Sequence, residues 1–507
     1  RATVSSGEKI LAGIIIPVIV FAYLNKGCMT EYKTPGVYIE EGPALLPSVT
    51  QVATTIPTFI GYTQKALDSN NVSLLNKPTR IRSLKEYEIF FGRAANEDNL
   101  EVTWVQEQTR GISAKETVSV KFNGPSSKHI MYYALQSYFA NGGGSCLIVS
   151  VGPFKGISEH TLLLEEMSAG LYASAREEDP TLIVFPEGQN MIESDYYRLQ
   201  NDALAQCNLL GDRFSILDLH TGNNLLTSGD VSASVASFRK SITHHLKYGA
   251  AYFPNIKTIF PYQYHDAAVN IVHMVNKKPG SFNGAALANL KDRENAAYNR
   301  SAYTKIKQAI KAFGVVIPPS AAIAGVYVAV DTARGVWKAP ANIELKGVLG
   351  LTYHVTPTEQ SSLNVDAVSG KSINCIRSFN SKGTRVWGAR TLAGNDNEWR
   401  YIPVRRFVNM VEESCKKASA QFVFKPNDTQ TWTKVKAMIE NYLTILWRQG
   451  ALAGAKSEAA FYVACGLNQT MTAQDVLNGN LIVEIGMAVI RPAEFILLRF
   501  SIKMQPR

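Results

Sequence analysis

The chain has 507 residues, of which 46% are hydrophobic and 19% are charged. At about 100–200 residues per domain this length holds two to four domains, and the ordinary apolar fraction excludes a wholly disordered chain. The formal net charge of +10 is scattered along the chain, which argues against a nucleic-acid groove and leaves an acidic protein partner open. None of the six cysteines forms a CxxC pair, so we expect buried reduced thiols.

Residues 1–28 differ in character from everything that follows. An apolar run from Ile10 to Leu24 is interrupted by Pro17 and is short for a membrane span. Three interpretations remain open: the apolar core of a leader, a membrane anchor, and an extra arm that is foreign to the folded protein. We place the start of the functional domain at Met29.

The next segments predict strands and then an α/β region. Residues 29–62 hold two short strand-like runs, at 37–41 and 56–62, and residues 63–119 are more polar and predict a small separate region. From 120 to 365, short apolar runs such as 146–149, 182–185 and 214–219 alternate with helical spacing. Strands that alternate with helices favour a largely parallel sheet covered on both faces.

The last third, residues 366–507, combines strands and helices. Residues 404–417 and 428–449 predict amphipathic helices, and the second carries one apolar stripe. Residues 493–504 predict a final strand with four large apolar side chains on one face, namely Ile496, Leu498, Phe500 and Ile502. The whole chain is therefore expected to be a multidomain α/β and α+β protein.

A search for catalytic chemistry finds little. The phosphate loop, the nucleophile elbow and the zinc-binding HExxH helix are all missing from the sequence. Asp218 and His220 follow a predicted parallel strand, where α/β enzymes hold their ligands, but two such residues make at most half a site. We expect no catalytic residue, no cofactor and no metal.

Eight stretches, taken together, resemble the tail sheath proteins of contractile phages and of phage-tail-like injection systems. They include Thr34–Glu41 (TPGVYIEE), Val386–Thr391 (VWGART), Trp399–Arg406 (WRYIPVRR) and Arg491–Ile496 (RPAEFI), and the others are 56–62, 138–143, 331–342 and 446–452. The resemblance runs in order from Met29 to the C-terminus.

The resemblance implies a fold and a function. The fold is an inner sheath domain, made from residues 29–62 and 366–507, with an outer α/β domain at 120–365 inserted between them. The function is a structural subunit, not an enzyme, that polymerises helically around an inner tube and contracts to drive the tube through a target envelope. Implied partners are other copies of the chain, the inner tube protein, and baseplate and terminal cap proteins, with a membrane only as the target. The resemblance also implies that the chain is assembled in the bacterial cytoplasm. The assembled sheath would be part of a phage tail or of a released or cell-associated injection particle.

The residues themselves agree with strand exchange between subunits, because a strand at each end of the chain is expected to be free to pair with a neighbour's open sheet edge. The candidate donor residues are Val37, Tyr38, Ile39, Glu40, Glu494, Phe495, Ile496, Leu498, Phe500 and Ile502.

A candidate tube contact is the basic side of the 428–449 helix, which carries Lys434, Lys436 and Arg448; an ordinary solvated face is the competing interpretation. Two alternatives of other classes remain: an α/β enzyme with its site near Asp218 and His220, and a structural protein anchored in a membrane through residues 10–24.

Overall fold

Short runs of β-branched and aromatic residues build a large mixed sheet at the centre of the described chain. The computed structural model describes residues 48–107, 115–156, 162–221 and 227–495, all of which belong to one of the chain's two structural units. Residues 1–28 and the candidate donors Val37, Tyr38, Ile39, Glu40, Ile496, Leu498, Phe500 and Ile502 lie outside the described residues.

The large sheet has eight strands, and only its two outermost pairings are antiparallel. The expectation of a largely parallel sheet is therefore confirmed. In spatial order the strands are β15 (Gly383–Trp387), β14 (Ile373–Phe379), β8 (Gly249–Phe253), β7 (Phe214–Asp218), β6 (Leu182–Val184), β1 (Pro57–Thr63), β5 (Cys146–Pro153) and β2 (Thr79–Ile81).

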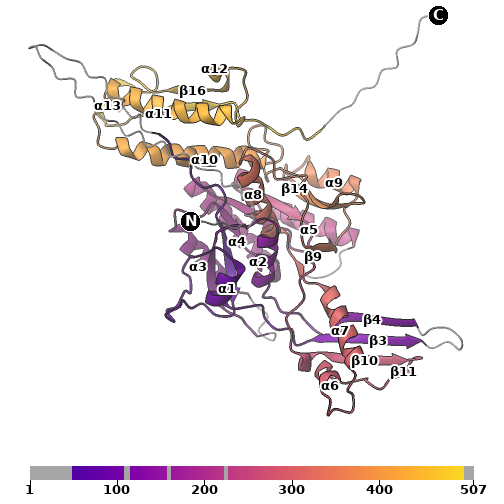
Figure 1. Cartoon of the computed structure of the whole chain (residues 1–507). Coiled ribbons are helices and arrows are strands. Elements are labelled where there is room, and N and C mark those ends of the chain that lie inside the picture. Colours follow the sequence, from indigo (N-terminus) through magenta and orange to yellow (C-terminus); the bar gives the residue numbers. More distant parts are fainter. Residues whose placement is uncertain (1–47, 108–114, 157–161, 222–226, 496–507) are drawn as a thin grey trace, which may run out of the picture. The chain divides into compact units, whose positions relative to one another are not determined.

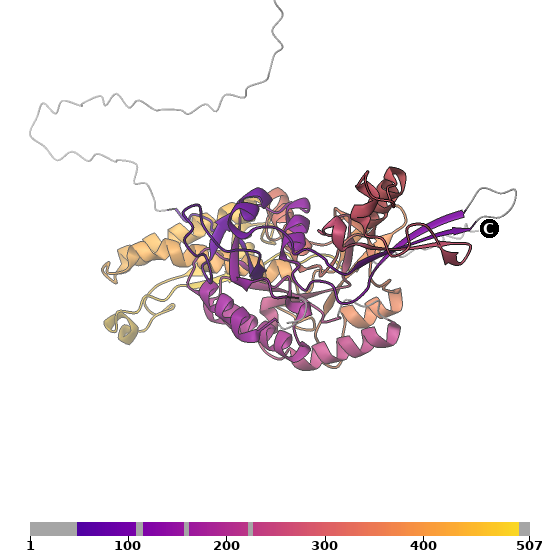
Figure 2. The ribbon, with the colours of Figure 1, turned by 90° about the horizontal axis from the view of Figure 1, so that it is seen from below.

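Helices cover both faces of this sheet (Figures 1 and 2). Alternation along the strands separates two cores: Phe59 of β1 packs into one and Ile60 into the other. The first face carries α1 (Leu84–Phe91), α2 (Met131–Ala140) and α8 (Ser320–Arg334). The second carries α3 (Leu164–Ala175), α4 (Glu193–Leu210), α5 (Ser228–Ser241) and α9 (Pro357–Asn364).

A smaller sheet forms a module with its own core (Figure 1). Its strands are, in order, β11 (Lys278–Pro279), β10 (Asn270–Val275), β3 (Leu100–Glu107) and β4 (Lys115–Phe122), packed with α6 (Leu287–Lys291) and α7 (Arg300–Phe313). A three-stranded sheet connects this module with the large sheet: β12 (Val316–Ile317), β9 (Ile256–Thr258) and β13 (Val348–Leu351).

The C-terminal module consists of two long helices and a two-stranded sheet. The helices α10 (Ile402–Ser419) and α11 (Thr429–Arg448) run side by side in Figure 1. Asp428 caps α11, since its carboxylate accepts the Thr431 N–H at 2.9 Å, which explains why the predicted helix starts where it does. The module also contains α12 (Ser457–Ala460), β16 (Phe461–Ala464), α13 (Ala473–Leu477) and β17 (Glu484–Met487).

Three of the expected boundaries are corrected by the sheet topology. Residues 56–62, assigned above to the inner domain, form β1 and lie between β5 and β6 in the large sheet. Residues 63–119 are not a separate region, because β2 joins the large sheet while β3 and β4 join the smaller one. Strands β14 and β15, assigned to the last third, also belong to the large sheet. Pairing between distant segments, which local pattern does not encode, decides each case.

Two further findings concern membrane and thiol chemistry. Within the described parts of the chain, no helix combines the length and the apolar character that crossing a bilayer requires. The five described cysteines, Cys146, Cys207, Cys375, Cys415 and Cys465, are buried with free thiols, as expected.

Candidate functional site

A buried ion pair joins the large sheet's layer to the C-terminal module. Asp331 of α8 and Arg406 of α10 lie with their nitrogen and oxygen 2.7 Å apart, and their side chains are only 4% and 3% exposed. Arg406 also donates to the Thr54 carbonyl at 3.0 Å, while the Thr54 hydroxyl donates to Asp331 at 2.6 Å. The Arg406 guanidinium lies 4.6 Å from the centre of the Tyr327 ring. The segment that enters β1 is thus tied to two helices by one charged centre.

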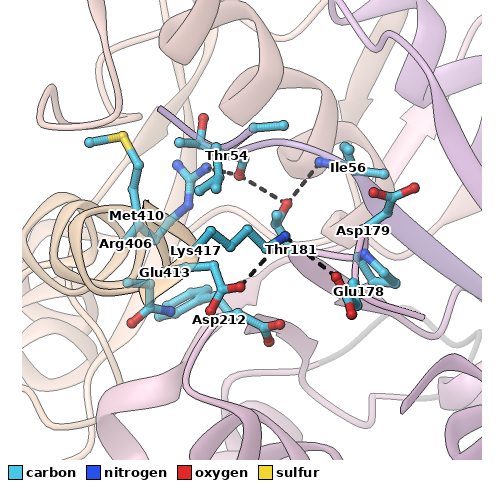
Figure 3. Close-up of a pocket in the computed structure, with 15 residues that line it drawn as sticks. Thr54, Ile56, Glu178, Asp179, Thr181, Asp212, Arg406, Met410, Glu413 and Lys417 are labelled. Atoms are coloured by element: carbon cyan, nitrogen blue, oxygen red, sulfur yellow. Dashed lines mark hydrogen bonds and ion pairs between the residues drawn. The ribbon is translucent and has the colours of Figure 1, made fainter. Parts of the chain in front are cut away.

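A hollow beside this centre separates the C-terminal module from the ends of β6 and β7 (Figure 3). Lys417 of α10 reaches across it, lying 3.5 Å from Glu413 of its own helix and 3.8 Å from Glu178 of the sheet layer. Asn409 donates to the Arg213 carbonyl at 3.1 Å, and Arg213 in turn donates to the Ser174 carbonyl at 2.6 Å. The interface is polar on both sides, which is typical of surfaces between domains that can move.

Arg405, the neighbour of Arg406, is buried in a stack of aromatic rings. Its guanidinium lies 4.2 Å from the centre of the Trp399 ring and 5.1 Å from that of Tyr248. It donates to Asn409 at 2.6 Å and to Glu412 at 2.7 Å. A planar guanidinium is suited to stacking and hydrogen bonding at once. The two adjacent arginines therefore fix opposite sides of the start of α10.

Glu494 anchors the chain just before its last residues. Arg390 clamps its carboxylate through Nε at 2.9 and 3.0 Å and through Nη2 at 2.7 Å. Asn364 and Tyr401 donate to it at 2.7 and 3.2 Å. Although burial opposes the shift, the hydrogen bonds from Arg390 and Asn364 and the charge of Arg390 lower the pKa of Glu494. The next residue, Phe495, is 69% exposed. Glu494 thus fixes the point from which the C-terminal segment departs.

A groove with apolar walls and a charged rim of Glu398, Glu412 and Arg491 runs between α10 and β17. Its walls are Val404, Val408 and Val411 from α10, facing Ile485, Met487 and Val489 from β17 and its extension, and the groove also includes Trp399, Glu412 and Arg491. On its other side β17 pairs with β16, and Ala488 donates to the Ala460 carbonyl at 2.8 Å. Because amides alternate along a strand, those of Ile485, Met487 and Val489 point away from β16.

The candidate tube-contact residues lie on the exposed side of α11. Lys434 and Arg448 are exposed, and Lys436 is half-buried and lies 3.8 Å from Glu440, one helical turn away. The apolar stripe of the same helix, with Val435, Ile439 and Leu446, is buried in the module core. The structure therefore brings the three basic residues to one element but leaves their role as a prediction.

Asp218 and His220 do not form a common site. Asp218 is 1% exposed, and its carboxylate accepts the Ser320 N–H at 2.9 Å, at the start of α8. His220 Nε2 instead faces the Met191 carbonyl at 3.0 Å. Burial raises the pKa of Asp218 to about 7. The arrangement caps a helix and braces a loop, which accounts for both residues structurally.

The crevice at the carboxyl ends of β1 and β6, where doubly wound folds bind ligands, is filled by the protein itself. Glu187 is fully buried there and accepts the Tyr62 N–H at 2.9 Å and the Met131 N–H at 3.4 Å. His129 lies beside it, with Nδ1 3.6 Å from the Glu187 carboxylate. These side chains hold the strand ends together.

The charged centres at Asp331, Arg406, Arg405 and Arg390 were not among the predicted site residues. The stretches that contain them, 331–342, 386–391 and 399–406, contribute only to the resemblance to sheath proteins. One sequence feature could have revealed these residues: Arg405 and Arg406 stand together inside the otherwise apolar start of α10. Charged residues in a core-facing stripe are rarely buried without a partner, so such a pair indicates buried counter-charges. Glu412 is seven residues from Arg405 on the same helical face, whereas Asp331, 75 residues from Arg406, is not identifiable from local pattern.

Comparison with known proteins finds one matching family model and several similar solved structures. Residues 394–503 match the family model described as the phage tail sheath C-terminal domain. The PVC sheath complex of an extracellular contractile injection system, in the contracted state, is 30% identical with a TM-score of 0.58 and covers 93% of this chain and 98% of that chain. The helical sheath of the anti-feeding prophage, also contracted, is 30% identical with a TM-score of 0.59 and coverage of 93% and 99%.

Two further matches concern a baseplate and a prophage. A baseplate structure of the anti-feeding prophage is 30% identical with a TM-score of 0.60, covering 93% of this chain and 100% of that chain. A putative prophage major tail sheath protein of Pseudomonas aeruginosa is 27% identical over 137 residues, which is 27% of this chain. The match spans only 34% of that curated relative.

Buried ion pairs join the modules of this α/β body, a construction that structural proteins and enzymes share. The solved sheath structures, 30% identical over nearly the full length of both chains, then decide the family. The chain belongs to the contractile tail sheath proteins, as the sequence resemblance implied, and it is a structural sheath subunit.

Proposed function

We propose that copies of this chain assemble helically around an inner tube by exchanging terminal strands, and that the resulting sheath contracts to drive the tube through a target envelope. The matched sheath structures, two of them contracted and one called helical, support this proposal. The particle is a phage tail or an extracellular injection particle, assembled in the bacterial cytoplasm before release.

The observation that carries the proposal is the incomplete sheet beside the α10 groove. A two-stranded sheet is marginal by itself, and among the described residues no third strand pairs with the outer edge of β17. Three valines of α10 face Ile485 and Met487 of β17, and Val489 just beyond the strand, across the groove. A strand from another copy would gain main-chain hydrogen bonds from β17 and apolar contact from α10.

The donor in this proposal is the C-terminal segment of a neighbouring copy. Its alternating Ile496, Leu498, Phe500 and Ile502 would enter the acceptor module at about 1.5–3 kcal/mol for each fully buried side chain, before association costs. Glu494 would act as the fixed root of the donated strand, and Phe495 as its first free residue. Val37, Tyr38, Ile39 and Glu40 supply the second donor strand.

Donation to a neighbour that is itself a donor is a heterologous contact, so it propagates as a helix and does not close as a dimer. The domain assignment follows: residues 29–55 and the C-terminal module form the inner mesh, while the large sheet lies outside it. Since the buried Arg406–Asp331 pair holds the C-terminal module to the large sheet, the bodies would rotate about the segments that lead into the donated strands while the mesh persists.

Three further partners complete the proposal. The basic side of α11, with Lys434, Lys436 and Arg448, would contact an acidic inner tube. Baseplate proteins would adjoin one end of the sheath, in keeping with the matched baseplate structure, and a cap protein the other end.

Removing residues 495–507 tests strand exchange while keeping the Glu494–Arg390 anchor. We expect the truncated chain to remain folded and monomeric, because the groove beside β17 stays empty. The matched control replaces Arg499 and Lys503, on the opposite strand face, by Gln and should still assemble. Negative-stain microscopy and sedimentation measure the outcome, and hollow cylinders from the truncated chain would disprove strand donation.

A further inference from the structure

The outer edge of β17 is within reach of the chain's own C-terminal segment as well as of a neighbour's. Backbone pairing in this module continues through Ile490, whose N–H donates to the Ala451 carbonyl at 3.4 Å. Only four residues, 490–493, then precede Glu494. Four residues are enough for a hairpin loop, and proline, here Pro492, is a favoured turn residue. The segment that follows can therefore, by its length, fold back on β17 of its own subunit.

Such self-pairing would compete with donation to a neighbour. A hairpin closes a loop of a few residues at a small cost in chain entropy, whereas pairing with a neighbour removes the translational and rotational freedom of a whole subunit. The groove beside β17 is the same in both cases and gives no preference for either. A sheath built by strand exchange therefore needs a feature outside the groove that disfavours the hairpin.

The structure shows the chain held elsewhere at this point. In the part of the chain that the structure describes, residues 491–495 make no backbone hydrogen bond to β17. Glu494 is instead clamped by Arg390, which is fixed in turn by the buried Asn374 of β14. The Asn374 side chain accepts the Arg390 N–H at 2.8 Å and donates to the Arg390 carbonyl at 2.8 Å. The clamp is thus built on the large sheet and not on the sheet of β16 and β17.

Releasing Glu494 is unfavourable for two reasons. Arg390 is 4% exposed and Glu494 is its only ion-pair partner among the described residues, so release would leave a buried cation without a counter-charge. In an extended strand Glu494 also shares the face of the apolar donor side chains, so a hairpin would turn its carboxylate toward the groove. The rim of that groove already holds two carboxylates, Glu398 and Glu412, against one arginine, Arg491.

We propose that the Arg390–Glu494 clamp holds the root of the C-terminal segment away from its own β17, so that the segment pairs with a neighbouring copy and not with its own subunit. The inference rests on the proposed strand exchange and adds how the chain distinguishes a neighbour's edge from its own. Glu494 is a positioning residue in this account, because neither it nor Arg390 lines the groove. Phe495, 69% exposed, already points into solvent directly after the clamp.

Two engineered cysteines report self-pairing. With residues 490–493 as the hairpin loop, Met487 and residue 496 stand opposite each other, and such paired residues have Cα atoms about 5.5 Å apart, as a disulfide requires. Chains carrying Met487→Cys with Ile496→Cys should therefore form an internal disulfide only when the segment pairs with its own β17. A non-reducing gel and mass spectrometry detect this disulfide, and sedimentation with microscopy measures polymer yield.

The cysteine pair is introduced into the otherwise wild-type chain, into Glu494→Ala and into the control Asp266→Ala. The control removes a carboxylate of similar exposure, 22% against 20% for Glu494. Like Glu494, Asp266 accepts from a cation, Lys307, and from a tyrosine hydroxyl, that of Tyr303. Asp266 belongs to the module of β3 and β10, so its loss should not affect the choice between self-pairing and donation.

We expect Glu494→Ala to lower polymer yield by about tenfold or more and to raise the internal disulfide by a similar factor, while Asp266→Ala matches the wild type. Arg390→Met with Glu494→Met releases the clamp without leaving an unpaired buried charge and should give the same result, which decides the matter if Glu494→Ala does not fold. Released variants that polymerise like the wild type, or that stay monomeric without the internal disulfide, would overturn the inference while wild-type polymers still support strand exchange. An internal disulfide without polymer in the otherwise wild-type chain would instead contradict the proposed function itself.

Discussion

At the scale of single residues, buried charged side chains lie at the junctions between modules. Arg406 and Asp331 are almost completely removed from water, which is costly for each ion alone. The bidentate contact, the two hydrogen bonds to Thr54 and the Tyr327 ring offset that cost only while every partner is present. Such a centre fixes the geometry of the junction more than it adds stability.

Replacing Arg406 by Leu leaves Asp331 buried without its counter-charge. We expect the free energy of unfolding to fall by about 3–5 kcal/mol, and the double variant Asp331→Leu with Arg406→Leu to recover part of the loss. Urea unfolding followed by circular dichroism measures both. The exposed pair Lys416–Glu413 is the control, where Lys416→Ala should cost at most about 1 kcal/mol. A loss at Arg406 no larger than in this control would contradict the assigned role.

A second residue-scale prediction concerns pH. Burial raises the pKa of Asp218 from its ordinary 3.8 to about 7, so between these values the folded chain binds a proton that the unfolded chain does not. The free energy of unfolding should therefore decrease as the pH rises from about 4 to 7. Buried Glu97, whose pKa is raised to about 7 by the same cause, adds to this slope.

Asp218→Asn should remove the contribution of Asp218, which is at most about 1.4 kcal/mol per pH unit, while its side-chain oxygen can still cap α8. Denaturant titrations at several pH values measure the slope. Asp292→Asn, at an exposed turn, is the control and should leave the slope unchanged. An unchanged slope in Asp218→Asn would show that this carboxyl group is already charged in the folded protein at neutral pH.

Sequence reasoning reached Asp218 and His220 through their position after a strand, and it rightly judged them weak. It could not assign Asp218 its role, because the Ser320 amide that it caps is 102 residues away. The anchor residue Glu494 was predicted only as part of a donor strand. Its clamp by Arg390 depends on a contact across 104 residues, for which a local pattern carries no signal.

At the scale of elements, the proposed strand exchange depends on β17. Met487→Pro removes an amide that points away from β16, so the acceptor edge is damaged while the β16–β17 pairing is retained. We expect Met487→Pro to stay folded but unassembled. Met487→Leu keeps both the amide and the apolar side chain and should assemble. Size-exclusion chromatography and microscopy distinguish them, and cylinders formed by both variants would exclude β17 as the acceptor.

The elements themselves were largely predictable from sequence. Apolar runs predicted β5, β6 and β7, and the apolar stripe of residues 428–449 predicted α11 with nearly its observed ends. The place of β1 was not predictable, because seven buried residues fit either a central strand or a separate arm. The place of β1 in the large sheet is determined by its pairing with β5 and β6, which follow about 85 to 125 residues later in the chain.

At the scale of the whole molecule, the proposed function requires that the sheath first holds a tube and later lets the tube move relative to the bodies. Across the polar hollow, the ion pair between Lys417 and Glu178 is long, at 3.8 Å, and largely exposed, whereas the neighbouring Arg406–Asp331 pair is 2.7 Å long and buried. The apolar groove beside β17 is by contrast suited to a contact that stays closed. Different interfaces of one subunit can therefore be exchanged or retained during a single transition.

The tube contact gives the prediction that belongs to this scale. Reversing Lys434, Lys436 and Arg448 to Glu changes the exposed side of α11 but leaves its buried stripe intact. Since none of these three residues is among those that line the groove beside β17, we expect sheaths to form at normal yield but without tube inside, and increasing salt should release tube from wild-type sheaths in the same way.

Co-sedimentation of sheath with purified tube measures this coupling directly. The control variant reverses Lys277, Lys278 and Lys291 to Glu. It changes the net charge by the same amount, but its substitutions lie in the four-stranded module, so it should retain tube. Tube retained by the α11 variant would remove this helix as the contact. If the α11 variant instead fails to form sheaths while the control forms them, net charge is excluded as the cause. The three residues would then belong to the contact between subunits.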